Sequence, residues 1–214
     1  RAAGSIHVLD EIPLTLPEGK LLHTLRLPEV RAIDEIPEPR LRADIWKAVH
    51  VGLELSRPRA VARWLSLSGD IGELEPELFV GRSVVGWLDE CARVTLMVVT
   101  LGEPLNLEVD RLRENSLADA YHLDSVGQTL LDALVETVNA DINHAVRKAG
   151  YEPIPRHCPG EGDWAPAVQP LLLRAVGAER IDVTCAEDHQ LHPRGSVSAM
   201  IGWRSIGASS ADRL

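Results

Sequence analysis

The chain has 214 residues, enough for one sizeable hydrophobic core, and we expect a single domain. Hydrophobic residues make up 45% and charged residues 25%, a composition typical of a soluble globular protein. The formal net charge of -10 repels phosphate backbones and anionic membrane surfaces, so we expect neither nucleic acid nor a membrane as a partner. Three cysteines without close paired spacing argue against a secreted disulfide framework and predict a cytoplasmic protein.

The N-terminal part of the chain predicts strands, loops and a connector. From Ser5 to Leu27, short alternating apolar pieces are interrupted by prolines, which indicates edge strands and loops. The next segment, up to residue 40, combines two prolines with several charges and predicts a connector. We expect residues 1–40 to pack on a main domain formed by residues 41–214.

Two helices and a buried strand are predicted next. Apolar residues at helical spacing indicate a helix over residues 41–53. Ser56-Arg57-Pro58 resembles a cap followed by proline in the first turn of a second helix, which would carry Trp64. The run VTLMVVTL, residues 94–101, is rich in β-branched residues and too continuous for an amphipathic element. It therefore predicts a central strand buried on both faces.

The longest regular element is predicted between Ser116 and Lys148, where apolar residues keep a helical period. Ser116 is followed three residues later by Asp119, an arrangement close to a capping box, and Gly150 suits the C-terminal end. Gly127 lies inside this helix at a cost of about 1 kcal/mol relative to alanine, so we expect it to allow the close approach of another backbone.

The C-terminal third predicts one more helix and two strands. Apolar spacing indicates a helix over residues 166–176, and residues 181–184 and 196–202 predict strands joined by a polar connection that contains histidines. Helices and strands alternate without a regular βαβ rhythm. The sequence therefore predicts an α+β fold with an antiparallel sheet.

The segment PRHCPGEGDW, residues 155–164, gathers many reactive residue types between these elements, and a metal site is the first interpretation to test. Thiolate and imidazole suit zinc, and the available ligand types are His157, Cys158, Cys185, His189 and His192. Their spacing matches no common zinc arrangement, so we predict that no metal is bound.

A catalytic triad and a phosphate-binding loop are two further interpretations of the same segment, and the sequence argues against both. A triad could combine Cys158, His157 or His189, and Asp163, but the chain has no nucleophile-elbow sequence. A phosphate cradle would need bare amides where Glu161 and Asp163 place carboxylates.

The residues alone leave two interpretations of this loop open. Arg156 and nearby backbone amides could bind a small ligand that bears a carboxylate. Alternatively, Arg156 bonds local carbonyls and Trp164 packs the loop against the core.

Several separated segments carry a family resemblance. They read TLG at residues 100–102, LDSVG at 123–127, RHCPGEGDW at 156–164 with Gln169 after it, IDVTCAED at 181–188 and PRGSVSAMIG at 193–202. In this order they resemble the activation (reactivation) domain of cobalamin-dependent methionine synthase. The corresponding family motifs are T-I-G, L-D-A-x-G, R-x-x-P-G-Y-G-D-W, I-G-V-x-L-T-E-S and P-x-K-S-V-S-A-I-I-G. The resemblance covers about residues 41–202 and is more specific than one loop would be.

The resemblance implies an α+β fold with a twisted antiparallel sheet and surrounding helices. It also implies binding of S-adenosylmethionine, which in the family remethylates cobalamin that has been oxidised to the inactive cob(II)alamin state. The electron comes from a flavodoxin-type partner. A chain of this kind would act in trans on a separate cobalamin-binding methyltransferase, and cobalamin would reach it only through that protein.

The resemblance also assigns the loop residues. Arg156 would hold the carboxylate of S-adenosylmethionine, and Cys158 and Gly160 would let the ligand approach the backbone closely. Pro159 and Glu161 complete the ligand-binding stretch. The supporting residues are Asp163 and Trp164. No catalytic residue is required of the chain, because the chemistry belongs to the methyl donor and the cofactor.

Two positions depart from the family motifs in chemically important ways. Glu161 stands where the loop has tyrosine, and its carboxylate could repel the ligand's carboxylate or attract its sulfonium. Gly195 stands where the last motif has lysine. The alternatives are therefore a non-catalytic module that docks on a corrinoid protein without the methyl donor, and, more distantly, a metal-dependent enzyme.

Overall fold

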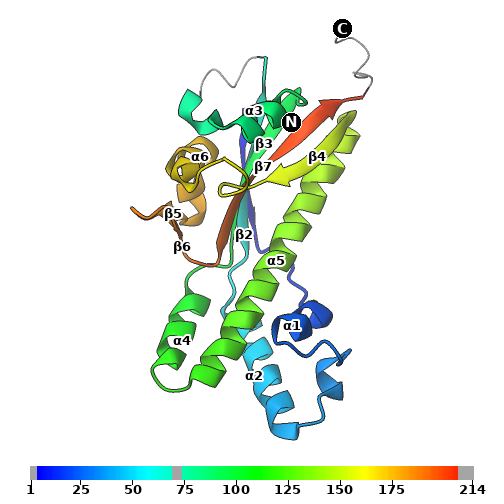
Figure 1. Cartoon of the computed structure of the whole chain (residues 1–214), viewed down its shortest axis with the longest axis vertical. Helices are drawn as coiled ribbons and strands as arrows, with labels where there is room; N and C mark the ends of the chain where they lie inside the picture. Colours follow the sequence, from blue (N-terminus) through cyan, green and yellow to red (C-terminus); the bar gives the residue numbers. More distant parts are fainter. Residues whose placement is uncertain (1–3, 69–73, 207–214) are drawn as a thin grey trace.

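The computed structural model describes residues 4–68 and 74–206, which form a five-stranded antiparallel sheet with helices on both faces (Figure 1). The strand order is β1-β2-β3-β7-β4, and a second sheet pairs β5 with β6. The bounds are β1 Ile6–Asp10, β2 Arg59–Ser66, β3 Arg93–Thr100, β4 Tyr151–His157, β5 Thr184–Cys185, β6 Leu191–His192 and β7 Ser196–Ser205. The predicted α+β class with an antiparallel sheet is confirmed.

Strand β3 is the centre of the sheet, as the run VTLMVVTL predicts. Its residues from Val94 to Thr100 are all buried, and β2 and β7 pair with it along its whole length. Met97 and Val99 face one core, whereas Leu96 and Val98 face the other. A strand buried on both faces needs apolar residues at consecutive positions, which explains the continuous pattern.

The first core is covered by three helices, α1 Glu18–Thr24, α2 Pro39–Leu55 and α5 Leu117–Lys148. Helix α5 runs diagonally across the sheet in Figure 1, and the Ser116 hydroxyl caps it by accepting a bond from the Asp119 amide at 3.3 Å. A Cβ on Gly127 would lie 2.8 Å from Leu105 Cδ2 in α4, Pro104–Arg113. The close neighbour at Gly127 is therefore a side chain of α4, where the sequence predicted a backbone.

The second core lies under shorter elements on the opposite face. Helices α3 Arg82–Leu88 and α6 Gln169–Val176 cover it, together with the short helices η3 Pro76–Phe79 and η5 Ala178–Ile181. The predicted helix over residues 166–176 is present as a short turn, η4 Pro166–Val168, that continues into α6. Of the two predicted C-terminal strands, residues 196–202 lie in β7, whereas the residues around 181 form η5 before the two-residue strand β5.

Two further sequence predictions are wrong. The predicted helix after Ser56 is strand β2, in which Ala60 and Ala62 face the first core while Val61 and Leu65 face the second. Val61 and Leu65 are four residues apart, a spacing that fits one face of a helix and also one face of a strand. Periodicity alone therefore does not distinguish the two elements here. Residues 5–27, expected to form edge strands and loops, contain helix α1, which buries Leu21 and Leu22.

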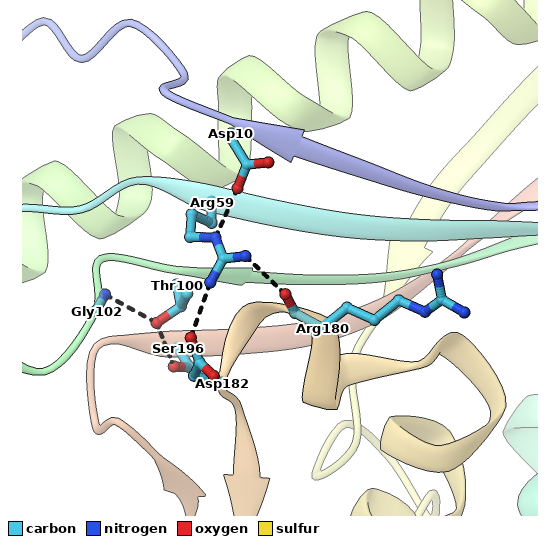
Figure 2. Close-up of polar contacts among 7 residues, drawn as sticks. All are labelled: Asp10, Arg59, Thr100, Gly102, Arg180, Asp182 and Ser196. Atoms are coloured by element: carbon cyan, nitrogen blue, oxygen red, sulfur yellow. Dashed lines mark hydrogen bonds and ion pairs between the residues drawn. The ribbon is translucent and has the colours of Figure 1, made fainter.

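A single arginine connects β1, at one edge of the sheet, to η5, which covers the second core. Figure 2 shows Arg59 of β2 donating from Nε to Asp10 Oδ1 at 2.7 Å and from Nη1 to Asp182 Oδ2 at 2.9 Å. Its Nη2 donates to the Arg180 carbonyl at 2.6 Å. The guanidinium therefore joins β1, β2 and the end of η5 in one network.

Hydroxyl groups join the adjacent ends of β3 and β7. Ser196 Oγ donates to Thr100 Oγ1 at 2.9 Å, and the Gly102 amide donates to the same oxygen at 3.0 Å (Figure 2). Both side chains are buried. These bonds fix the end of the sheet beside which the candidate site lies.

Within the described part of the chain, the helices include none that is both long and apolar enough to cross a membrane.

We predict that Gly202→Ala destabilises the fold. A Cβ at this buried position of β7 would lie 2.5 Å from Cys91 Sγ, 3.1 Å from Trp87 Cζ2 and 3.2 Å from Ile154 Cβ. Because three packed groups must move, we expect a loss of about 1–3 kcal/mol in the free energy of unfolding, measured by urea titration. The control is Gly86→Ala in α3, where the added Cβ meets nothing within 4 Å. Equal stability of the two variants would contradict the prediction.

Candidate functional site

The candidate site begins where β4 leaves the sheet. Strand β4 pairs with β7 over residues 200–205, whereas residues 196–199 of β7 pair, among the described strands, with β3 alone. The loop of residues 156–164 departs at this point and leads to η4 and α6. One edge of β7 therefore lies beside the loop, and along residues 196–199 its backbone groups face the loop rather than a second partner strand.

The loop is closed by its own backbone bonds. The Gly160 amide donates to the Trp164 carbonyl at 2.7 Å, the Glu161 amide to the Cys158 carbonyl at 3.0 Å, and the Trp164 amide to the Glu161 carbonyl at 3.2 Å. Gly160 and Gly162 have φ values of 99° and 59°, a region that other residues rarely adopt. The two glycines are thus required by the turn itself.

Asp163 attaches the loop to helix α3. Its carboxylate accepts from the Arg82 amide at 2.7 Å and from the Ser83 amide at 3.0 Å, and it also accepts a short bond from the Ser83 hydroxyl. The Ser83 hydroxyl, followed by these amides, lowers the pKa of Asp163 below its usual range. The carboxylate therefore acts as the N-terminal cap of α3.

Trp164 and His157 form the base of the loop. Trp164 is fully buried and donates from Nε1 to the Leu78 carbonyl at 2.9 Å. The His157 ring stacks on Trp164 at a centroid distance of 5.5 Å and on Trp87 at 6.2 Å. His157 is thus held between two indoles, which suits packing better than metal binding.

Arg156 pairs with a carboxylate on the long helix. Its Nη1 donates to Glu136 Oε1 at 2.9 Å, and the two side chains keep exposed fractions of 32% and 53%. Sequence reasoning missed Glu136, because nothing in the pattern of α5 distinguishes it from other polar residues on that helix. Only the packing of β4 against α5 brings the two charges together. The result is an accessible pair of opposite charges beside the loop.

Glu161 folds back on its own loop. Its Oε2 accepts from the Cys158 amide at 2.9 Å and lies 3.3 Å from His157 Nδ1. The amides of Cys158 and Gly160 therefore both have acceptors within the loop. Burial, followed by the nearby Glu161 carboxylate, raises the pKa of the Cys158 thiol above its ordinary value, so this thiol stays protonated at neutral pH.

Two clefts adjoin at this end of the sheet. The first, the loop cleft, has a volume of about 400 Å³ and is lined by Cys158, Pro159, Gln169, His189, Gln190, Leu191, Arg194, Ser196, Val197 and Ser198. The second, the α4–α5 cleft, has a volume of about 270 Å³ and is lined by Leu101, Gly102, Leu105, Asn106, Arg113, Asp124, Gly127, Gln128, Leu131, Arg194 and Gly195. Sequence reasoning found the loop side of the first cleft and missed the second.

The ligand types considered for a metal are spread over several elements. Cys158 and His189 line the loop cleft, whereas His157 lies between two indoles, Cys185 is in β5 and His192 is in β6. Over residues 4–68 and 74–206, no three histidine, cysteine or acidic side chains are grouped as a metal would need. The site instead contains a pair of opposite charges, an open strand edge and two clefts. This arrangement suits the binding of a small ligand.

One comparison with known proteins finds a likeness. A solved structure described as the crystal structure of the MetH reactivation domain bound to AdoHcy matches with a TM-score of 0.59 and 11% sequence identity, covering 97% of this chain and 81% of that chain. No family model and no curated protein matches the sequence. At this identity the likeness shows the fold, and it confirms the fold that the sequence resemblance implied.

We predict that Asp163→Asn removes a contribution to stability that depends on pH. Because the folded-state pKa of Asp163 is lowered, the carboxylate stabilises the fold above its unfolded pKa of about 3.9, and this stabilisation is lost as the pH falls through the folded value. The gap in unfolding free energy between wild type and variant should be largest near neutral pH and should shrink in acid. Urea titrations at several pH values measure it, with Asp132→Asn on α5 as the control. A difference in unfolding free energy that stays constant with pH would contradict the role of the Asp163 carboxylate as the cap of α3.

Proposed function

We propose that this chain binds S-adenosylmethionine at the loop cleft and supports the reductive methylation of cobalamin on a separate methyltransferase of the methionine synthase type. The observation that carries the proposal is the shared fold with a reactivation domain that was solved with AdoHcy, combined with an arginine-headed loop beside a strand edge. The protein would then belong to the methionine biosynthesis machinery of the cytoplasm.

The residues present fit the amino-acid part of such a ligand. Arg156 offers a guanidinium to the ligand's carboxylate, and Glu136 offers a carboxylate to its ammonium group, 2.9 Å from the arginine. Both side chains are partly exposed, so each can exchange its present partner for a ligand. We propose that Pro159 and the backbone of Cys158 and Gly160 form the adjoining wall.

The chain's own residues would bind and orient the donor. S-adenosylmethionine supplies a methyl group when bound, and the corrinoid of the partner accepts it, so no general base is needed in the loop. The protonated Cys158 thiol agrees with a role in packing. Glu136 and Arg156 would set the position of the ligand, and Asp163 and Trp164 would hold the loop on which it rests.

The electron donor is proposed to be a flavodoxin-type protein. The arginines considered for its docking surface are paired with carboxylates, so they would attract an acidic partner only weakly. Arg59 is paired with Asp10 and Asp182, and Arg111 is paired with Glu108 at 2.6 Å. Arginines that are already neutralised by neighbouring carboxylates attract an acidic partner weakly. Docking would therefore depend on local shape more than on steering by charge.

One observation favours the alternative, a module that docks on a corrinoid protein without binding the methyl donor. The Glu161 carboxylate occupies the Cys158 amide that a ligand would approach. Pull-down with a cobalamin-binding methyltransferase, in the presence and absence of S-adenosylmethionine, separates the two functions. Capture that is unchanged by the ligand, with no heat of ligand binding in calorimetry, would support the docking module.

We predict that Arg156→Ala weakens the binding of S-adenosylmethionine about ten- to a hundredfold, because a charge-assisted bond to the ligand's carboxylate is lost. Isothermal titration calorimetry measures the change. Arg147→Ala, at an exposed position in the last turn of α5, is the matched control and should bind as the wild type does. Equal affinity of the two variants would remove Arg156 from the site, and no binding by the folded wild type at millimolar ligand would refute the proposal.

We predict that Glu161→Ala strengthens binding about two- to tenfold, since the Cys158 amide loses its internal acceptor and a negative charge leaves the loop. Glu161→Gln should have a smaller effect, because its amide oxygen can still accept from Cys158 while the charge is gone. The same calorimetric titration measures both variants. Weaker binding by Glu161→Ala would mean that the carboxylate contacts the ligand directly.

A further inference from the structure

The imidazole of His157 is enclosed by three elements at the base of the loop. Helix α3 contributes Trp87, and strand β7 contributes Met200, which pairs with His157 in the sheet. The loop contributes Trp164 and Glu161. Within the described part of the chain, Glu161 is the one charged residue that lies within ion-pair distance of the ring, whose side chain keeps an exposed fraction of 16%.

Apart from this pair, the titratable side chains of the loop keep one charge state around neutral pH. The Arg156 guanidinium is always charged. The Ser83 hydroxyl, followed by backbone amides, lowers the pKa of Asp163, so this carboxylate stays ionised. Burial raises the pKa of the Cys158 thiol, so the thiol stays protonated. Histidine is the residue type that ordinarily changes charge between about pH 5 and 8, so the sensitivity of the loop to pH in this range falls on His157.

One oxygen of Glu161 links the imidazole to the backbone of the loop. Its Oε2 accepts from the Cys158 amide at 2.9 Å and lies 3.3 Å from His157 Nδ1. The carboxylate therefore covers the amide only while it keeps this position beside the ring. A charged donor forms a stronger bond to a carboxylate than a neutral donor does, so a proton on His157 tightens the hold on Glu161.

The surroundings of the ring accept a positive charge. The indoles of Trp87 and Trp164 stack on it with planes inclined by 27° and 12°, and the face of an indole attracts a cation. His157 Nε2 is buried and has no hydrogen-bond partner among the described residues. The neutral ring therefore either buries a bare Nε2 or turns a lone pair of Nδ1 toward the Glu161 carboxylate. The imidazolium buries one unpaired N–H as well, but it gains the ion pair and the contacts with both indoles.

From these contacts we propose that His157 and Glu161 form a proton-dependent latch on the ligand-binding loop. With the ring protonated, Glu161 is held on the Cys158 amide and keeps the ligand from it. With the ring neutral, the carboxylate leaves more easily and the amide becomes available. The inference rests on the proposed function and adds a regulation of its site by pH. The motif that the loop resembles has tyrosine in place of Glu161 and specifies no residue at position 157, so the latch is a feature of this chain.

Calorimetric titration with S-adenosylhomocysteine at about pH 6 and about pH 8 tests the latch. A histidine that titrates near pH 6.5 is about three-quarters protonated at about pH 6, so the wild type should bind about two- to fourfold more weakly there. His157→Phe keeps an aromatic ring between the indoles, and its ratio of affinities gives the baseline for any titration of the ligand itself. The matched control is His50→Phe in α2, where the histidine stacks on Trp46 at 5.8 Å, and it should keep the wild-type ratio.

A second measurement needs no ligand. The chain has three cysteines, so isotope-labelled cysteine gives three amide signals in an NMR spectrum, and Cys158→Ser identifies the signal of Cys158 by its loss. Because the bond from this amide to Glu161 responds to the charge of the ring, the signal should move between about pH 6 and about pH 8 in the wild type and much less in His157→Phe. If circular dichroism shows that His157→Phe is unfolded, Glu161→Gln takes its place in both experiments, since it keeps an acceptor but removes the charge.

The two measurements separate the latch from the proposed function. A Cys158 signal that moves equally with pH in the wild type and in His157→Phe would overturn the latch, whether or not the chain binds the ligand. Binding of S-adenosylhomocysteine with the same pH ratio in both proteins would also overturn the latch and would leave the function standing. If the folded wild type binds no S-adenosylhomocysteine while the Cys158 signal moves only when His157 is present, the proton-dependent contact stands and the proposed function fails.

Discussion

The candidate site depends on the difference in length between two neighbouring strands. Strand β7 pairs with β3 from Ser196 to Trp203 but with β4 only from Met200 onward. A bulge shifts the pairing between Ile154 and His157, and β4 ends at His157, which pairs with Met200. The edge of β7 before Met200 is therefore left without β4, and Arg156, at the bulge, pairs with Glu136 of α5. Cys158 and Pro159 of the loop line the same cleft as residues 196–198 of this edge.

Much of the fold could be predicted from the sequence, because its largest elements repeat one pattern over many residues. Helix α5 and strand β3 were found in this way, and the separated motifs indicated the fold itself. The errors came from short segments. Val61 and Leu65 fit a strand and a helix equally well, and only the pairing of β2 with β3 decides between them. The Arg156–Glu136 pair joins residues from two elements through packing, for which a single sequence carries no signal.

The loop contains residues needed for its fold and residues available for binding, and a sequence motif does not distinguish the two kinds. Its glycines and Asp163 are needed for the turn and for the cap on α3, whatever the loop binds. Arg156, by contrast, pairs with Glu136 and also interacts with the Cys158 side chain, and a pairing between partly exposed charges contributes little to stability. Residues that the fold does not need are better candidates for binding than residues on which it depends. By this reasoning Arg156 and Glu136, rather than the glycines, distinguish a binding loop from a structural turn.

The stacking of His157 between Trp87 and Trp164 has a practical consequence. Both indoles sit at the base of the loop, and Trp87 also donates from Nε1 to the Pro155 carbonyl at 3.2 Å. Any shift of the loop would change the surroundings of at least one of these rings. Because indole emission responds to its immediate contacts, the protein contains its own optical probe of loop position, without a label.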